Sequence, residues 1–348
     1  MSPYILTMLL SSLGLGTTLT FMSSHWLLAW MGLEINTLAI LPLMAQHHHP
    51  RAVEATTKYF LAQATAAATI LFASSINAWA TGEWNIYCLS HPPATTLITM
   101  ALALKVGLAP MHLWMPPVMQ GLNLPTGLIM ATWQKLAPLT LIIQMAPFTH
   151  PLLFTSLGLM SILAGGWGGL NQTQLRKILA YSSIAHLGWM MIITQFKPQL
   201  TILVLTTYIV MTSATFLTFK LMTTTKINTL TTSWAKSPPT TAMAALVLLS
   251  LGGLPPLTGF MPKWLILQEL TMQGLPLTAT LMALSALLSL YFYLRLCYAM
   301  TLTISPNTNN TTTPWRTQNT QTTAPLATLM TMSLLLLPLT PLAQALIT

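Results

Sequence analysis

Long apolar segments separated by short polar or proline-containing stretches recur along the whole chain. Each is close to the roughly 20 residues that a helix needs to cross the hydrocarbon core of a bilayer. The pattern predicts an all-α, polytopic membrane protein with about eleven transmembrane helices. The predicted ranges are 3–22, 25–45, 56–80, 93–119, 124–146, 149–170, 176–195, 199–222, 240–270, 274–300 and 325–346.

Two of these segments are too long for one straight span and carry prolines in their interior. Pro110 interrupts 93–119, and Leu254-Pro255-Pro256 interrupts 240–270. Proline inside a membrane helix frees backbone groups that lipid cannot satisfy, so such breaks are tolerated where they line a polar cavity. Two discontinuous helices in separate parts of the chain are typical of transporters built from two related halves.

The remaining polar stretches are loops rather than domains. We expect a single integral membrane domain over residues 1–348, with a polar loop at 301–324 between the last two helices. The first apolar segment lacks a preceding basic region, which favours a retained span over a cleaved signal.

Composition agrees with the membrane interpretation. The 348 residues are 53% hydrophobic and only 5% charged, with a mean hydropathy of +0.66 and no aspartate. Soluble domains carry about 25% charged residues. The bias towards Thr, Met and Leu suggests a strongly skewed genome such as a mitochondrial one.

The basic residues gather in loops that alternate along the chain. If the N-terminus lies on the inner side, the loops after the second, sixth, eighth and tenth predicted helices all lie there. They contain or adjoin Arg51, Lys58, Arg176, Lys177, Lys220, Lys226, Lys236 and Arg316, whereas the other side has chiefly Glu83 and Lys197. The positive-inside rule therefore places the N-terminus inside and the C-terminus outside.

The net charge of +9 needs no nucleic acid to explain it, because the same loops account for it. Cys88 and Cys297 are too few for a typical iron–sulfur cluster. No GxGxxG fingerprint or Walker motif is present. The run His47-His48-His49 lies on an irregular loop with at most Glu54 as an acidic companion, so we expect no metal site.

Four ionisable residues fall within the predicted spans: Glu34, Lys105, Lys135 and, at the second break, Lys263. A charged side chain at the centre of a span costs roughly 2.5–3.5 kcal/mol on insertion scales. One such lysine can snorkel to the headgroups, but pairing and water explain the set better. Glu34 needs a lysine from another helix, and Lys105 is the expected partner.

Other residues leave alternatives open. His112 and His186 suit either a proton relay or neutral hydrogen bonding between helices. Glu269 is either an end residue or a partner of Lys263. Gly165, Gly166, Gly168 and Gly169 favour close helix packing over a phosphate loop.

Four stretches carry a resemblance that covers the whole chain. They are LLAWMGLEINTLAILPL, ALALKVGLAPMHLWMPPVMQGL, GGLNQTQLRKILAYSSIAHLGWM and LLSLGGLPPLTGFMPKWLI. The chain resembles the antiporter-like membrane subunits of respiratory complex I, and among them the mitochondrially encoded NADH dehydrogenase subunit 2 family. The resemblance implies two inverted repeats, each with one discontinuous helix.

The resemblance also implies a charged axis: Glu34 as the acidic partner, Lys105 on the first broken helix, Lys135 as the connecting lysine and Lys263 on the second. The expected activity is that of a subunit of proton-translocating NADH:ubiquinone reductase in the mitochondrial inner membrane, with the N-terminus in the matrix. NADH, FMN, iron–sulfur clusters and ubiquinone belong to other subunits. Expected partners are neighbouring antiporter-like subunits and phospholipids such as cardiolipin, with no nucleic acid.

Three functional hypotheses remain. The chain conducts protons through the buried charges, it is a structural scaffold whose charges only transmit conformational change, or it is a stand-alone cation/proton antiporter.

Overall fold

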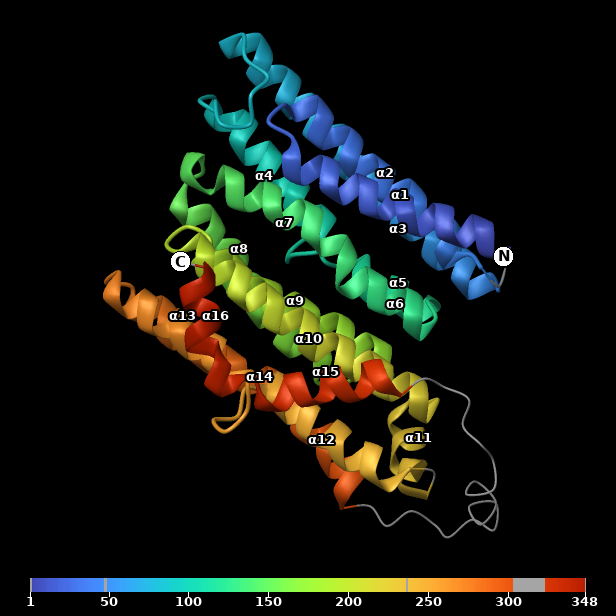
Figure 1. The fold of residues 1–348 in the computed structure, drawn as a ribbon. Helices are drawn as coiled ribbons and strands as arrows, with labels where there is room; N and C mark the ends of the chain where they lie inside the picture. The colour runs from blue at the N-terminus through green and yellow to red at the C-terminus, as the bar shows by residue number, and fades with distance from the viewer. Residues whose placement is uncertain (1, 47–48, 236, 303–322, 348) are drawn as a thin grey trace. The chain divides into compact units, whose positions relative to one another are not determined.

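The computed structural model describes residues 2–46, 49–235, 237–302 and 323–347 (Figure 1). These residues form helices and connecting turns, with no strand among them and only two isolated bridges. The chain divides into a first unit, Met1–Ser161, and a second unit, Ile162–Thr348. The expected polar loop lies almost wholly outside the described residues, as do His47, His48, Lys236 and Arg316.

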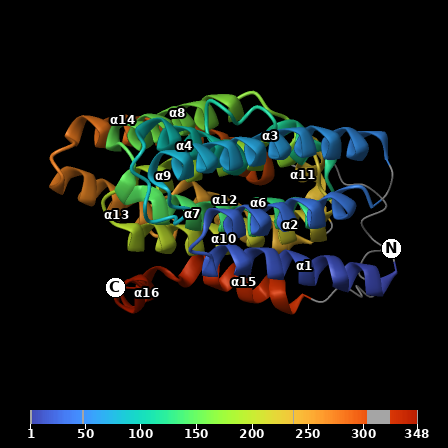
Figure 2. The same ribbon diagram turned by 90° about the horizontal axis from the view of Figure 1, so that it is seen from above.

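The first unit contains seven α-helices and the start of an eighth within its described residues. They are α1 (Pro3–Met22), α2 (Trp26–Met44), α3 (Pro50–Thr81), α4 (Pro92–Val106), α5 (Met115–Gly121), α6 (Leu124–Ala131), α7 (Trp133–Met145), the short 3-10 helix η1 (Ala146–Phe148) and the beginning of α8 (Pro151–Gly169). In both ribbon views α1 runs alongside α2 (Figure 2). Their close approach requires Gly32, since a Cβ there would lie 2.7 Å from Thr20 Cγ2.

The second unit takes up the rest of α8 and the remaining described helices. They are α9 (Leu175–Ile193), α10 (Pro198–Met222), α11 (Ile227–Thr231), η2 (Thr232–Ala235), α12 (Pro238–Gly252), α13 (Phe260–Met272), α14 (Pro276–Thr301), α15 (Ala324–Leu335), η5 (Leu337–Leu339) and α16 (Thr340–Ile347). Ala214, Val247, Leu326 and Met330 form a buried cluster that joins α10, α12 and α15.

Both predicted helix breaks are confirmed, and they begin with the same local structure. Gly107 follows α4 at φ +87°, and Gly253 follows α12 at φ +82°, conformations that residues with a Cβ rarely adopt. In each case the next amide reaches back five residues, from Leu108 N to Ala103 O at 2.9 Å and from Leu254 N to Leu249 O at 3.4 Å. The shared sequence Gly-Leu-x-Pro therefore ends each half-helix.

Eight helices in the described part of the chain are long and apolar enough to cross a membrane, and the bent pair α15/α16 raises the number to nine. The two halves of that pair meet at 69°. The 19-residue α9 carries Arg176 and Lys177 in its first turn, and α12 has only 15 residues. The multi-pass architecture is therefore confirmed, whereas the count of about eleven spans and the inverted relation of the repeats stay predictions.

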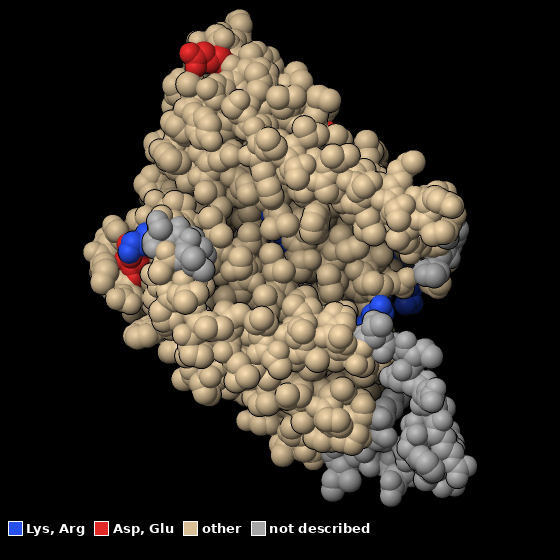
Figure 3. All heavy atoms as spheres, viewed as in Figure 1, with Lys and Arg blue, Asp and Glu red and all other residues tan. Residues whose placement is uncertain are grey.

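The visible surface agrees with a lipid-facing exterior. Figure 3 shows a face with few charged atoms, which gather in small groups. The most exposed large apolar side chains include Trp79, Trp167 and Met22. Apolar side chains are expected on the outside of helices that face lipid.

The glycine-rich end of α8 packs against its neighbours, as predicted. A Cβ on Gly165 would lie 2.7 Å from Ala185 N, and one on Gly166 would lie 2.8 Å from Leu288 Cβ. A Cβ on Gly168 would be similarly crowded by the ring of Tyr181, and a Cβ on Gly169 by the ring of Phe292. The small residues thus let α8 approach α9 and α14 closely.

Replacing Gly165 with alanine is expected to destabilise the second unit by about 1–3 kcal/mol, because the new methyl group has to displace the backbone of α9. Thermal unfolding of the assembled protein in detergent measures the effect. Gly14→Ala is the matched control, since a Cβ on Gly14 meets nothing within 4 Å. Equal unfolding temperatures for both variants would contradict the close packing.

Candidate functional site

The end of α4 exposes backbone carbonyls that a continuous helix would have used. Trp114 Nε1 donates to Leu104 O at 3.0 Å, and Gln63 Nε2, from α3, donates to Lys105 O at 3.3 Å. Both contacts satisfy carbonyls inside the membrane segment, where an unpaired one would be costly. The break is therefore a built polar site rather than a packing defect.

Lys105 and Lys135 line the same internal cavity in the first unit. Lys105 comes from the last turn of α4 and is 5% exposed, while Lys135 comes from α7 and is 2% exposed. The volume of this cavity is about 20 Å³. The lining residues are Leu33, Asn36, Thr37, Tyr59, Gln63, Lys105, Val106, Trp114, Met115, Met130, Gln134, Lys135, Ala137 and Pro138.

Lys135 lies in the first turn of α7, which follows α6 after the single residue Thr132. Thr132 keeps right-handed helical angles and its amide donates to Leu128 O, so Leu124–Phe148 has the length of one span. Pro138, inside α7, has no amide hydrogen and leaves Gln134 O without its helical donor. Gln134 Nε2 donates to Asn36 O at 3.3 Å and so ties the start of α7 to α2.

Glu34 lies on α2 beside this cavity, within one turn of the lining residues Leu33, Asn36 and Thr37, and is half-buried. Its Oε2 accepts a hydrogen bond from Thr37 Oγ1 at 3.2 Å. Glu34 and Lys105 form no direct ion pair, since the ion pairs between described residues are Lys58–Glu54 and Lys197–Glu269, but the two charges interact electrostatically. Lys105 Nζ is buried and has no hydrogen-bond partner in the described part of the chain. The role of Glu34 as the acidic partner stays a prediction.

The second unit contains a smaller site around Lys263. Lys263 Nζ donates to Gly252 O at 2.9 Å, so this side chain itself satisfies a carbonyl at the end of α12. Lys263 and His186 line one cavity of about 10 Å³, together with Trp189, Val204, Thr207, Met211, Gly259, Pro262 and Ile266. The His186 ring lies 5.5 Å from that of Tyr208, measured between centroids. The structure therefore brings together two residues that the sequence suggested separately.

His112 lies within the first break, between α4 and α5, and is half-buried. Its carbonyl accepts a hydrogen bond from Met115 N at 3.0 Å, which helps to begin α5. His112 is not among the residues that line the cavity of Lys105. A relay role for His112 and for His186 stays a prediction.

Glu269 pairs with a residue that the sequence did not suggest as its partner. Its side chain, 7% exposed, forms an ion pair with Lys197 at the start of α10, and Gln273 Nε2 donates to its Oε1 at 3.1 Å. The ion pairs between described residues do not include Glu269 with Lys263, so the alternative of a direct pair between them is wrong. The predicted topology placed Lys197 on the less basic side of the membrane. This placement was the sequence signal that could have suggested Lys197 as the partner of Glu269.

Arg295 is a further half-buried charge that the sequence reasoning missed. From α14 its guanidinium donates to Leu170 O and to Gln172 O, just after α8 ends. A cation at the C-terminal end of a helix is stabilised by the helix dipole and by the unpaired carbonyls. The position of Arg295 within an otherwise apolar span was the sequence signal.

Among the described residues no group of three or more His, Cys, Asp or Glu side chains lies close enough to hold an ion. The two cysteines are free.

Comparison with protein families covers nearly the whole chain. Residues 23–289 match the family described as NADH:quinone oxidoreductase/Mrp antiporter, TM, and residues 290–344 match NADH dehydrogenase subunit 2 C-terminus. The chain is 76% identical to NADH-ubiquinone oxidoreductase chain 2 of Carassius auratus over 318 residues, which is 91% of each sequence. It is 75% identical to the corresponding chain of Cyprinus carpio, again over 91% of each.

Solved structures agree with this match. A chain of respiratory complex I from Thermus thermophilus with bound aureothin aligns over 97% of this chain and 80% of its own length, with a TM-score of 0.82 and 29% identity. A chain of the Mrp complex from Dietzia sp. DQ12-45-1b aligns over 97% and 76%, with a TM-score of 0.83 and 17% identity, and supports the fold alone.

The resemblance of the four sequence stretches is thereby confirmed on independent grounds. The chain belongs to the NADH dehydrogenase subunit 2 family, the antiporter-like membrane-arm subunits of the proton-pumping NADH-ubiquinone oxidoreductase, respiratory complex I.

Proposed function

We propose that the chain conducts protons through its buried lysines, with Lys105 and Lys135 as the central carriers. The observation that carries this proposal is the single small cavity that both side chains line from different helices. Two ammonium groups in so small a space repel each other, so a proton gained by one favours proton loss from the other. Lysine can serve in this way because its amine accepts and releases a proton as its surroundings change.

The neighbouring charges supply direction to this exchange. Glu34, on the helix that forms one wall of the cavity, attracts a proton towards Lys105 when it is ionised. Lys263 and His186 form the corresponding group in the second unit. Here Lys263 acts as the terminal carrier and His186, like His112 in the first unit, as an auxiliary donor or acceptor.

The setting of this activity is also part of the proposal. We place the chain in the mitochondrial inner membrane, with the N-terminus in the matrix and the C-terminus in the intermembrane space, because of the charge asymmetry of its loops. Its partners are other complex I subunits, especially neighbouring antiporter-like subunits. Those other subunits bind NADH, FMN, iron–sulfur clusters and ubiquinone, and electron transfer in them drives the proton movement.

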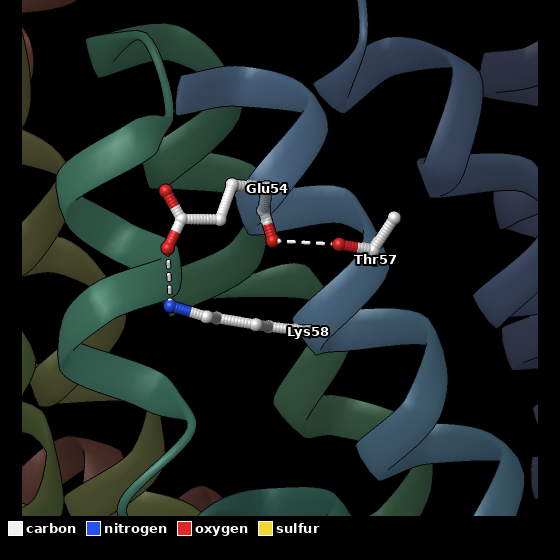
Figure 4. Close-up of polar contacts among 3 residues, drawn as sticks. All are labelled: Glu54, Thr57 and Lys58. Atoms are coloured by element: carbon white, nitrogen blue, oxygen red, sulfur yellow. Dashed lines mark hydrogen bonds and ion pairs between the residues drawn. The ribbon is translucent and has the colours of Figure 1, made fainter. Parts of the chain in front are cut away.

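An anionic phospholipid such as cardiolipin fits the basic end of the first unit. Arg51, Glu54, Lys58 and Gln120 line a surface pocket of about 210 Å³ together with Ala55, Pro117 and Gly121. Figure 4 shows that Glu54 binds Lys58 and that Thr57 donates to the Glu54 carbonyl. Arg51 can attract a phosphate group of the lipid. Lys58 can release the exposed carboxylate of Glu54 and bind a phosphate group instead.

Replacing Lys105 or Lys135 with methionine is expected to slow proton translocation and the NADH oxidation coupled to it at least about tenfold, because a positioned proton carrier typically contributes 10²–10⁴-fold. The measurements are the rates of NADH oxidation and of proton movement by the assembled complex in vesicles, and the ratio of the two. Lys220→Met is the matched control, since Lys220 is exposed and lines neither lysine cavity. Normal rates and a normal ratio in both buried variants would contradict the relay and favour a scaffold.

Replacing Glu269 with glutamine, or Lys197 with methionine, is expected to cost about 1 kcal/mol of stability, since Lys197 is half-exposed and the pair is screened by solvent. The ratio of protons to NADH should stay normal in both variants, because Glu269 is paired with Lys197 and not with Lys263. Lys263→Met should lower the ratio of protons to NADH. A lowered ratio in Glu269→Gln alone would show that Glu269 itself carries the proton.

Neutralising the surface pocket with the double change Arg51→Gln and Lys58→Gln is expected to weaken lipid retention by about 1 kcal/mol per basic residue removed. Native mass spectrometry of the purified complex measures the number of cardiolipin molecules retained. Glu54→Gln is the control, because it removes negative charge and should retain at least as much lipid. Unchanged lipid in the double variant would exclude this site.

A further inference from the structure

Three buried polar atoms around the first cavity lack partners. Asn36 is 2% exposed, and neither its Oδ1 nor its Nδ2 forms a hydrogen bond with any described residue. Lys105 Nζ is also buried and forms no hydrogen bond with any described residue. Buried polar atoms are almost always bonded to protein or ordered water, so three such atoms around one cavity point to a bound water.

The cavity has the size and the lining that one water needs. Its volume of about 20 Å³ exceeds the roughly 10–15 Å³ that one water molecule occupies on this measure. A buried water typically makes about three hydrogen bonds. Asn36 and Lys105 supply unpaired atoms, and the polar side chains of Tyr59 and Gln134 line the same space.

Helix α1 has a specific gap for the Asn36 side chain. A Cβ on Gly16 would lie 2.5 Å from Asn36 Oδ1 and 2.9 Å from its Cγ. The Asn36 carbonyl is held separately by Gln134 Nε2. The backbone of Asn36 is thus fixed by α7 and its side chain by the missing Cβ of α1.

We propose that Asn36 positions a water molecule that passes the proton between Lys105 and Lys135. The proposal rests on the proton conduction proposed above. An N–H bond of the Lys105 ammonium breaks as an O–H bond to the water forms. A second O–H bond of that water breaks as an N–H bond to Lys135 forms, so one proton and one positive charge move and no electron is transferred.

A neutral amide suits this role better than a carboxylate. Before the transfer Lys105 offers only donors, and after it the neutral amine also offers an acceptor. The water has to reverse its orientation between these states. The amide of Asn36 provides both a donor and an acceptor, so it can hold the water in either orientation, whereas an ionised carboxylate could only accept.

The first test is a density map of the assembled complex that resolves buried waters. We expect a water peak within hydrogen-bond distance of Lys105 Nζ and the Asn36 amide. The peak should persist in Asn36→Thr, whose hydroxyl can also donate and accept a hydrogen bond, and disappear in Asn36→Val, which has nearly the same shape as threonine but no polar atom. An empty cavity in the wild-type map, with waters visible at other buried sites, would overturn the proposal.

The second test compares proton translocation in the same variants. We expect Asn36→Val to slow coupled turnover about tenfold, because the water is no longer held in position for proton transfer, and Asn36→Thr to restore most of it. Gly16→Ala should also impair turnover because it displaces the Asn36 side chain, while Gly14→Ala should not. The glycine pair leaves Asn36 itself unchanged. Because a Cβ on Gly16 would also lie 2.9 Å from Gly32 O, loss of the water peak in Gly16→Ala with the backbone of α2 unmoved is the deciding result if the Asn36 variants fail to assemble, and a retained peak would overturn the proposal.

The two proposals can fail separately. Normal turnover in Asn36→Val and Gly16→Ala, with impaired turnover in Lys105→Met, would overturn the role of Asn36 and leave the lysine relay intact. Normal turnover in all three would overturn both. Equal impairment of Asn36→Thr and Asn36→Val would show that Asn36 acts through packing and would likewise overturn its role in holding the water.

Discussion

The structure around both helix breaks is governed by one requirement: a backbone carbonyl freed inside a membrane must find a donor. At the first break the donors are neutral, the indole of Trp114 and the amide of Gln63. At the second the donor is Lys263, which reaches Gly252 O. Polar side chains are therefore brought to each break by the backbone itself, before any question of proton transfer arises.

This difference places the two lysine amines in different surroundings. Lys105 is in the last turn of α4, and Lys263 reaches the last residue of α12, so each amine lies at the negative end of a half-helix. The neutral donors at the first break leave Lys105 Nζ facing the cavity without a protein partner among the described residues. Lys263 would have to give up a carbonyl contact to move. An amine without a fixed partner is better suited to exchange, and a bonded one to hold a proton before release.

Much of this arrangement could be predicted from the sequence, because the free-energy cost of a helix break or of a lysine within a span depends on the local sequence. Pro110 and the pair Pro255-Pro256 predict the breaks. A lysine flanked by apolar sequence can be identified as intramembrane without knowing which helices pack around it. Contacts between helices were harder to predict. The sequence suggested a Glu34–Lys105 pair and left Glu269 undecided, whereas the structure shows Thr37 beside Glu34 and Lys197 beside Glu269. No sequence spacing encodes these distances, since helix packing determines them.

The uncharged residues of the first cavity were missed for a related reason. An asparagine or glutamine within a span costs less than a lysine, so Asn36, Gln63 and Gln134 give no strong signal in hydropathy. Their importance follows only from what they touch: Gln63 binds a freed carbonyl, and Gln134 binds the backbone of Asn36. Together they fix the walls of the cavity without adding charge to it. A site that moves a proton needs such neutral groups, because each additional fixed charge would favour one lysine permanently and stop the exchange.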